Sequence, residues 1–227
     1  EATQRLLTEG GMNWGYSELF QVFDRRHLEA YLPACQRQSA EQGTLVHFAE
    51  THDNLRLAAR SAAWSDLRTA LTALCSDCGS FGFANGVEWY APEHIDVHGA
   101  SSLNWGGEPN AAPHLGRLQT LLNIHPSFLG HTPIELIHTG VGEVLAACRR
   151  RANPDECLLV VANLQDDTPA VVTWEPDAMP TDRDGRLHNL LGAPIPATVL
   201  QSLREAPISK AERVEYRVAN RPSDGSA

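Results

Sequence analysis

The sequence predicts an α/β segment that is followed by an all-β segment. Between residues 12 and 130, apolar runs rich in β-branched side chains alternate with amphipathic helical patterns. From Thr132 onward the apolar runs become short and are separated by turn sequences, which is typical of antiparallel sheet. The run at 44–49 ends abruptly in a polar cluster, and a helical pattern follows it. We therefore expect functional side chains at the carboxyl end of a strand that leads into a helix.

The elements of the first part follow from periodicity and turn residues. Gly10 and Gly11 end a first helix, and the aromatic-rich segment after them predicts a short strand with its loop. Leu28, Leu32 and Cys35 share one face of the next helical pattern. The expected elements are helix 1–9, strand and loop 12–23, helix 25–42, strand 44–49, helix 54–74, strand 79–89 and helix 115–124.

The second part predicts a small antiparallel β-sandwich. Its apolar runs are separated by turn sequences such as Asn153-Pro154-Asp155. Because the pattern changes near Gly130, we expect two domains, residues 1–130 and residues 131–227. The expected strands are 143–149, 156–164, 170–174 and 213–218.

The length of the α/β part limits its architecture. Residues 12–130 hold three strand–helix units, whereas a complete (β/α)8 barrel takes about 250 residues. We therefore expect a partial (β/α)8 (TIM) barrel made of the last three βα units. The chain starts with Glu1 rather than Met, so we expect it to be a piece of a longer parent chain. The open edges of a partial barrel are expected to bind the rest of the parent chain, or to cause self-association.

The composition excludes several classes of partner. The chain has 28 acidic residues against 18 lysines and arginines, which gives a formal charge of −10. An acidic surface disfavours binding to nucleic acid and to anionic membranes. No apolar run reaches the roughly 20 residues that a membrane-spanning helix needs, and no signal peptide is visible. We expect a cytoplasmic protein without nucleic-acid or membrane partners.

The cysteines and histidines predict neither a metal site nor a cofactor. Five cysteines are an odd number without a disulfide framework, so we expect reduced thiols. Cys75 and Cys78 have CxxC spacing but no second ligand pair, which favours thiols packed at a helix end. An irregular segment carries other metal-binding residue types, but their spacing fits no ligand motif. These residues are Glu93, His94, Asp96, His98 and His114.

Three segments together resemble the alpha-amylase superfamily of glycoside hydrolases. Residues 48–53 (Phe-Ala-Glu-Thr-His-Asp) look like the motif at its seventh barrel strand, in which a His-Asp pair closes the catalytic site. Residues 82–88 (Gly-Phe-Ala-Asn-Gly-Val-Glu) look like the glycine-rich motif of its eighth strand. Residues 158–164 (Leu-Leu-Val-Val-Ala-Asn-Leu) are similar to a core strand of its C-terminal β domain. The resemblance spans most of residues 12–175.

The resemblance implies a retaining glycosidase or glucanotransferase that acts on α-glucans or maltooligosaccharides. Asp53 matches the carboxylate that stabilises the transition state, and His52 matches its neighbour in the catalytic site. Arg56 is expected to pair with Asp53 or Glu50, and Thr51 stands where the family usually has Asn. The candidate substrate-binding residues are Arg56, Glu50, Trp14, Tyr16 and Glu88.

Retaining hydrolysis also needs a carboxylate nucleophile and an acid/base carboxylate. The family's nucleophile motif, Gly-x-Arg-x-Asp, is missing from this sequence, and Glu9 is the one early candidate for the acid. We therefore expect both groups to lie upstream in the parent chain, and we expect the fragment alone to be inactive.

Other interpretations remain open from the sequence. Asp53 precedes a helical pattern and is also a natural N-cap, and aromatic side chains such as Trp14 and Tyr16 also fill barrel cores. A non-catalytic carbohydrate-binding or interaction module with the same fold is the alternative function. A metal-dependent hydrolase built on the cluster around His52 is a third.

Overall fold

The computed structural model describes residues 2–99, 103–137, 142–150, 157–165, 168, 170–174, 190–191 and 214–218. The helices are α1 (Ala2–Thr8), α2 (Arg25–Gln42), α3 (Ala62–Leu74) and α4 (Ala112–Ile124). The strands are β1 (Trp14–Tyr16), β2 (Thr44–Phe48), β3 (Phe81–Gly82), β4 (Ile134–Ile137), β5 (Val144–Arg150), β6 (Cys157–Asn163), β7 (Ala170–Trp174) and β8 (Val214–Val218). The 3-10 turns are η1 (Leu19–Gln21), η2 (Leu57–Ala59), η3 (Asp77–Gly79), η4 (Val87–Trp89) and η5 (Pro126–Phe128).

The first part contains a three-stranded parallel sheet with β2 in its centre. Trp14 of β1 lies beside Thr44 of β2, and Phe48 at the end of β2 lies beside Gly82 of β3. A helix follows each strand, so the expected alternation and the parallel pairing are confirmed. Gly82 is needed in this register, because a Cβ atom there would lie 2.5 Å from the ring of Phe48. The expected bounds 79–89 are wrong, because β3 covers Phe81–Gly82 and the 3-10 turns η3 and η4 occupy the two ends of the expected range.

Helix α2 matches its expected range because its two ends carry strong signals. The carboxylate of Asp24 accepts a hydrogen bond from the His27 N–H (3.0 Å), which caps the amino end. Gly43, with φ of 138°, ends the helix and leads directly into β2.

Helix α3, in contrast, begins later than the sequence pattern predicts. The prediction of a helix from residue 54 is wrong, because α3 starts at Ala62 and Ser61 caps it by accepting a hydrogen bond from the Trp64 N–H (2.9 Å). The N–H of Leu57 donates to the buried carboxylate of Glu50 at 2.6 Å and is therefore tied to the strand end. Residues 51–60 thus form turns and the short η2 in place of a helix.

The second part is antiparallel in the residues that the structure describes. Strand β5 lies between β4 and β6, and β7 pairs with β8. The expected antiparallel pairing is confirmed, and β4 is a strand that the sequence pattern did not predict. The sandwich arrangement and the completion of a barrel by further strands stay predictions.

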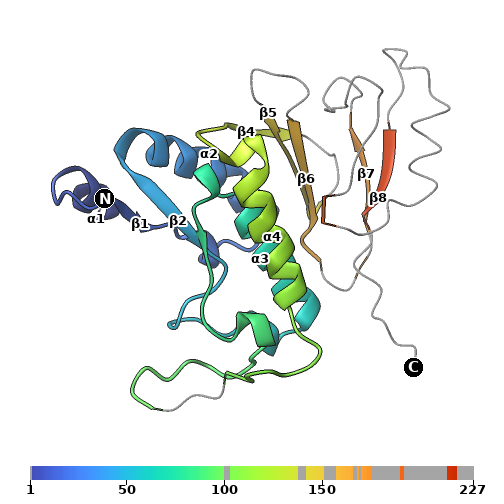
Figure 1. Cartoon of the computed structure of the whole chain (residues 1–227). Helices are drawn as coiled ribbons and strands as arrows, with labels where there is room; N and C mark the ends of the chain where they lie inside the picture. The colour runs from blue at the N-terminus through green and yellow to red at the C-terminus, as the bar shows by residue number, and fades with distance from the viewer. Residues whose placement is uncertain are drawn as a thin grey trace.

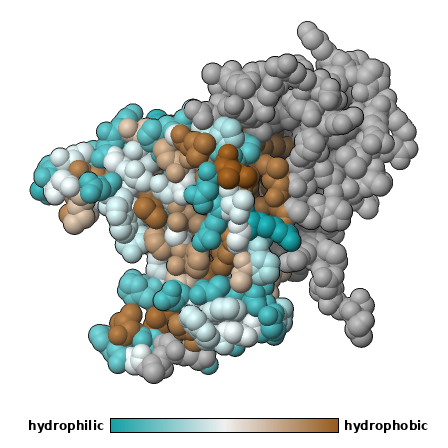
Figure 2. Space-filling model, viewed as in Figure 1, coloured by the Kyte–Doolittle hydropathy of each residue, from teal (hydrophilic) through white to brown (hydrophobic). Residues whose placement is uncertain are grey.

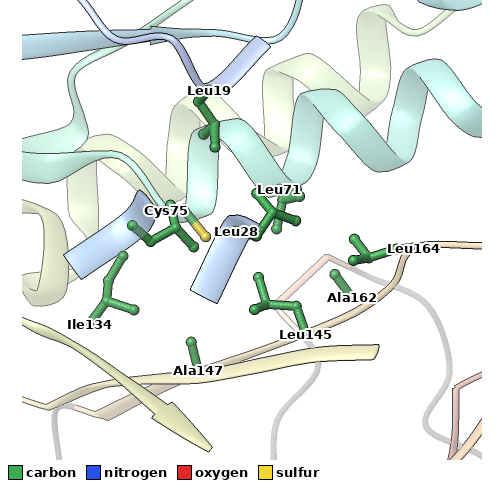
Figure 3. Close-up of a cluster of buried hydrophobic side chains, with 10 residues drawn as sticks. Leu19, Leu28, Leu71, Cys75, Ile134, Leu145, Ala147, Ala162 and Leu164 are labelled. Atoms are coloured by element: carbon green, nitrogen blue, oxygen red, sulfur yellow. The ribbon is translucent and has the colours of Figure 1, made fainter. Parts of the chain in front are cut away.

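Helices α2 and α3 lie between the two kinds of sheet. Both helices contact β2 on one side, while α2 also contacts β4 and β5 and α3 also contacts β6 (Figure 1). The largest hydrophobic cluster crosses this boundary and joins side chains from before and after Gly130 (Figure 3). Its buried members are Leu19, Leu28, Leu32, Leu71, Cys75, Ile134, Leu145, Ala147, Ala162 and Leu164. The two expected domains therefore share one continuous core in the described part of the chain.

The surface of the described residues is mixed. Figure 2 shows apolar areas on the face in view as separate brown regions between hydrophilic ones. Within the described ranges, no helix combines the length and the apolar character needed to cross a membrane.

The shared core makes a prediction about cooperativity. Leu145→Ala removes a fully buried side chain of β5 that faces α2 and α3, and should lower the free energy of unfolding by about 2–5 kcal/mol. Calorimetry and circular dichroism should show one transition that moves as a whole. The matched control is Leu55→Ala, whose side chain is 80% exposed. This control should stay within about 0.5 kcal/mol of the unchanged protein. Two separate transitions, of which Leu145→Ala moves one, would contradict a shared core.

Candidate functional site

The polar cluster lies at the carboxyl edge of the parallel sheet. Strand β2 ends at Phe48, and the residues that follow it turn back toward α3. Because the three strands are parallel and in register, Tyr16 at the end of β1 and Gly82 at the end of β3 lie at the same edge. In open and closed α/β sheets this edge is the usual place for ligands.

His52 and Asp53 project from this edge into solvent. The imidazole Nε2 of His52 lies 3.4 Å from a carboxylate oxygen of Asp53, and the two side chains are 58% and 79% exposed. The turn that presents them is built on Thr51, whose hydroxyl accepts from the Asp53 N–H (3.3 Å) and donates to the side chain of Asn54 (2.7 Å). Thr51 therefore builds this turn at the position where the resembling family has Asn. Both functional groups are free to contact a ligand.

A buried ion pair lies directly behind this turn. Arg56 Nε is 2.7 Å from a carboxylate oxygen of Glu50, and the two side chains are 1% and 2% exposed. Burial raises the pKa of Glu50, while the Leu57 N–H and the Arg56 charge act in the opposite direction. Of the two partners expected for Arg56, the structure selects Glu50. The pair has almost no exposed surface through which to reach a substrate.

Arg56 also connects β2 to the loop after β3. Its Nη1 donates to the carbonyl oxygen of Asn85 at 2.9 Å. Gly86 has φ of 96°, and a Cβ atom there would lie 2.8 Å from Arg56 Nη2, so the guanidinium packs against the backbone. The partly buried Glu88 accepts a hydrogen bond from the Gly86 N–H at 2.9 Å. Glu88 therefore stabilises this loop, and the loop in turn holds Arg56.

An aromatic surface runs along β1, from Trp14 at its amino end to Tyr16, which lies at the carboxyl edge of the sheet. Trp14 and Tyr16 are 48% and 54% exposed, and their ring centroids are 5.6 Å apart. Tyr16 also contacts Phe48 of the neighbouring strand, with ring centroids 5.1 Å apart. Neither side chain is enclosed in a core of the described residues. Flat, half-exposed rings of this kind can stack on the apolar face of a sugar.

The structure does not support two other roles that the sequence left open, Asp53 as a helix N-cap and Glu9 as the catalytic acid. Asp53 is not the N-cap of α3, since Ser61 holds that position. Glu9 follows α1 rather than a strand, and it pairs with Arg5 at 3.3 Å with both side chains largely exposed. Its position gives Glu9 no place at the carboxyl edge of the sheet.

A second cluster of reactive side chains was missed from the sequence. Asp77, Cys78 and His131 bring one ligand atom each to within 4.8 Å of one another. The CxxC spacing drew attention to Cys75, which is fully buried, while the partner of Cys78 is a histidine 53 residues away. No local sequence pattern indicates a contact between residues so far apart in the chain. Among the described residues, no metal-type group includes His94 or His98.

Comparisons with known proteins support the fold at a coarse level. No family model matches the sequence, and no curated protein matches it. Among solved structures, an alpha-amylase from Lactobacillus plantarum is similar, with a TM-score of 0.55 and 19% sequence identity. The match covers 73% of this chain and 40% of that chain, so this chain spans less than half the length of that enzyme. The structural similarity agrees with the resemblance found in the sequence motifs, and at this identity it concerns the fold alone.

The buried ion pair predicts a strong coupling between Glu50 and Arg56. Arg56→Met leaves a buried carboxylate without its cation and should lower the free energy of unfolding by about 3–5 kcal/mol at neutral pH. The Glu50→Gln/Arg56→Met double variant keeps the acceptor for Leu57 and should recover part of this loss.

The pH dependence of the stability provides the control for this prediction. The pKa of Glu50 is raised in the folded protein, so stability decreases as the pH rises from the unfolded to the folded pKa. Removing the Arg56 charge should raise that pKa further and make the loss smaller in acid than at neutral pH. Urea unfolding at neutral pH and in acid measures the loss of unfolding free energy. Equal losses in the single and the double variant would contradict the coupling.

Proposed function

We propose that this chain is part of an alpha-amylase-type glycosidase or glucanotransferase that acts on α-glucans. The observation that carries the proposal is the exposed His52–Asp53 pair at the carboxyl edge of parallel strands, on a turn that a buried ion pair supports. The similarity of the fold to an alpha-amylase and the sequence motifs around both strand ends agree with it.

In this proposal Asp53 stabilises the transition state. Its carboxylate accepts hydrogen bonds from two hydroxyl groups of one sugar ring, and these bonds become stronger as the ring flattens and gains positive charge. An interaction that strengthens in this way favours the transition state over the bound substrate. His52 donates to a neighbouring hydroxyl, and its position 3.4 Å from Asp53 keeps the two groups on the same sugar.

The surrounding residues take positioning and binding roles. Glu50 and Arg56 hold the turn from behind, and Glu88 fixes the loop that contacts Arg56. Trp14 and Tyr16 provide the stacking surface for an adjoining sugar. The proposal therefore treats the ion pair as support for the site and the aromatic side chains as direct substrate contacts.

The covalent chemistry is assigned to another part of a longer protein. A retaining mechanism needs a nucleophile and an acid/base carboxylate on either side of the glycosidic bond. Strands β1 and β3 are the edges of the described parallel sheet, and we propose that they pair with further barrel strands that carry those groups. The alternative, a carbohydrate-binding module without catalysis, shares the same ligand and differs in having no such partner.

The chain on its own should show no glycosidase activity. Asp53 can stabilise an oxocarbenium-like ring, but it opens no covalent route without a nucleophile and an acid. Reducing-sugar release from starch and from maltoheptaose should equal that of a buffer blank. Turnover that Asp53→Asn abolishes would show that the full catalytic set lies within this chain.

Sugar binding provides the positive test of the proposed function. A titration with maltoheptaose, followed by NMR, should shift the amide signals of His52, Asp53 and Tyr16, whereas cellohexaose should not. Asp53→Asn removes a charged acceptor and should weaken binding by about tenfold or more. Glu135→Gln is the matched control and should leave the affinity for maltoheptaose unchanged. This exposed acid lies on β4 of the antiparallel sheet and not at the carboxyl ends of the parallel strands. Equal responses to both sugars, or none at millimolar concentration, would reject an α-glucan site here.

A further inference from the structure

A second polar site lies at the opposite edge of the parallel sheet. The η3 turn carries Asp77 and Cys78 and immediately precedes β3, so it lies at the amino end of that strand. His131 follows η5 and reaches the same place. The site is therefore separate from the His52–Asp53 turn, which lies at the carboxyl end of β2.

The three side chains have the donor set and the spacing of a metal site. His131 Nδ1 lies 2.7 Å from Asp77 Oδ2 and 3.6 Å from Cys78 Sγ. Ligand atoms around a tetrahedral zinc ion lie about 3.3–3.7 Å apart, given bond lengths of about 2.0–2.3 Å. The sulfur–nitrogen distance of 3.6 Å already fits, and the nitrogen–oxygen distance of 2.7 Å must lengthen by about 0.6 Å to reach the lower end of this range. One nitrogen, one sulfur and one oxygen donor suit a borderline cation such as zinc.

The carboxylate of Asp77 is the strongest sign of a cation. Its side chain is 3% exposed, its Oδ2 lies 2.7 Å from the imidazole Nδ1 of His131, and the Cys78 thiol and the Arg149 charge lie close to it. A buried charge is costly unless it is paired or bound to a metal, and the guanidinium of Arg149 donates to backbone carbonyl oxygens beside this carboxylate. A divalent cation between these residues would satisfy the carboxylate oxygen whatever the protonation state of the imidazole in the metal-free protein.

Arg149 holds the backbone around the proposed ligands in place. The buried guanidinium of Arg149 donates to the carbonyl oxygens of Leu74 and Ser76, just before Asp77, and to that of Ser127 in η5. Cys78 itself has φ of 49° and ψ of 29°, a left-handed conformation that is uncommon for a residue other than glycine. Such strain persists where the surroundings enforce it, and it is frequent at functional sites. The Arg149 charge lies behind the site and reduces its affinity for cations, while Asp77 and a Cys78 thiolate together balance a divalent ion.

A pocket lies beside Cys78, one of the three proposed zinc ligands. The pocket has a volume of about 380 Å³, and its lining combines Cys78 and the amide side chains of Gln119 and Asn123 with apolar residues such as Phe81 and Phe128. A structural zinc site has four protein ligands, whereas a site with three keeps a position for water or for a ligand atom. We propose that Asp77, Cys78 and His131 bind one zinc ion, whose remaining position accepts water or a donor atom of a small ligand in this pocket.

Binding has a definite proton balance. Zinc replaces the thiol proton of Cys78, which goes to solvent, and it requires His131 Nδ1 without a proton. A thiol with an ordinary pKa of about 8.5 carries its proton at neutral pH without metal. Affinity should therefore increase as the pH rises, with proton release that calorimetry in buffers of different ionisation heat can measure.

The test measures metal binding by the whole chain after treatment with a chelator. Calorimetry with zinc should give one ion per chain, and cobalt in its place should give a tetrahedral visible spectrum with a thiolate-to-cobalt charge-transfer band. Cys78→Ser and His131→Gln should each lower the affinity by about 100-fold or more, since even outer-shell partners of a metal change affinity by 10–100-fold. Melting temperatures without metal should stay close to that of the unchanged protein.

A matched control and a measurement without variants complete the test. His27→Gln removes the histidine of another His–Asp pair, Asp24–His27, which is exposed and has no cysteine, and it should leave zinc binding unchanged. In the unaltered protein, zinc should protect Cys78 from alkylation, as mass spectrometry of the peptide can show. The proposal is overturned if the unaltered chain binds no zinc, if the cobalt complex lacks the thiolate band, or if zinc leaves Cys78 alkylation unchanged.

Discussion

The guanidinium of Arg149 is the interaction on which much of this arrangement depends. It is fully buried on β5, and it donates to the carbonyl oxygens of Leu74, Ser76 and Ser127. These carbonyl groups lie at the carboxyl end of α3 and in η5, where a helix leaves its last acceptors without internal partners. One side chain thereby fixes the end of α3 and the η5 turn against the antiparallel sheet, and its ring contact with Phe128 adds packing to the same place.

The two candidate sites share a common construction. At each, functional groups are presented by a turn whose base is anchored by a buried arginine: Arg56 behind His52 and Asp53, and Arg149 behind Cys78. Arginine suits this task because its fork of donors can satisfy several carbonyl or carboxylate oxygens at once and keeps its charge when buried. A rigid base allows a polar side chain to stay exposed and still be well positioned for a ligand.

The sequence predicted those features that local signals determine. The amphipathic pattern predicted the range of α2, and the apolar run before Glu50 predicted β2 together with the polar edge. Helix α3 was extended too far, because periodicity cannot show that Glu50 captures the Leu57 N–H. The Asp77–His131 contact joins residues far apart in the chain, so no spacing rule could reveal it. Tertiary contacts decided each of these failures.

The continuous core has a consequence for how such a chain can change. Half of the largest cluster comes from helices and turns before Gly130, and half from the antiparallel strands after it and the bend that follows β6. A recombination event with its crossover at Gly130 would join helices and strands whose facing side chains had been selected against other partners. In such close-packed interiors, a volume mismatch of a single methylene group changes the stability of the protein. The helical layer and the antiparallel sheet should therefore be inherited together, and compensating changes across their boundary should be found in the lineage of this protein.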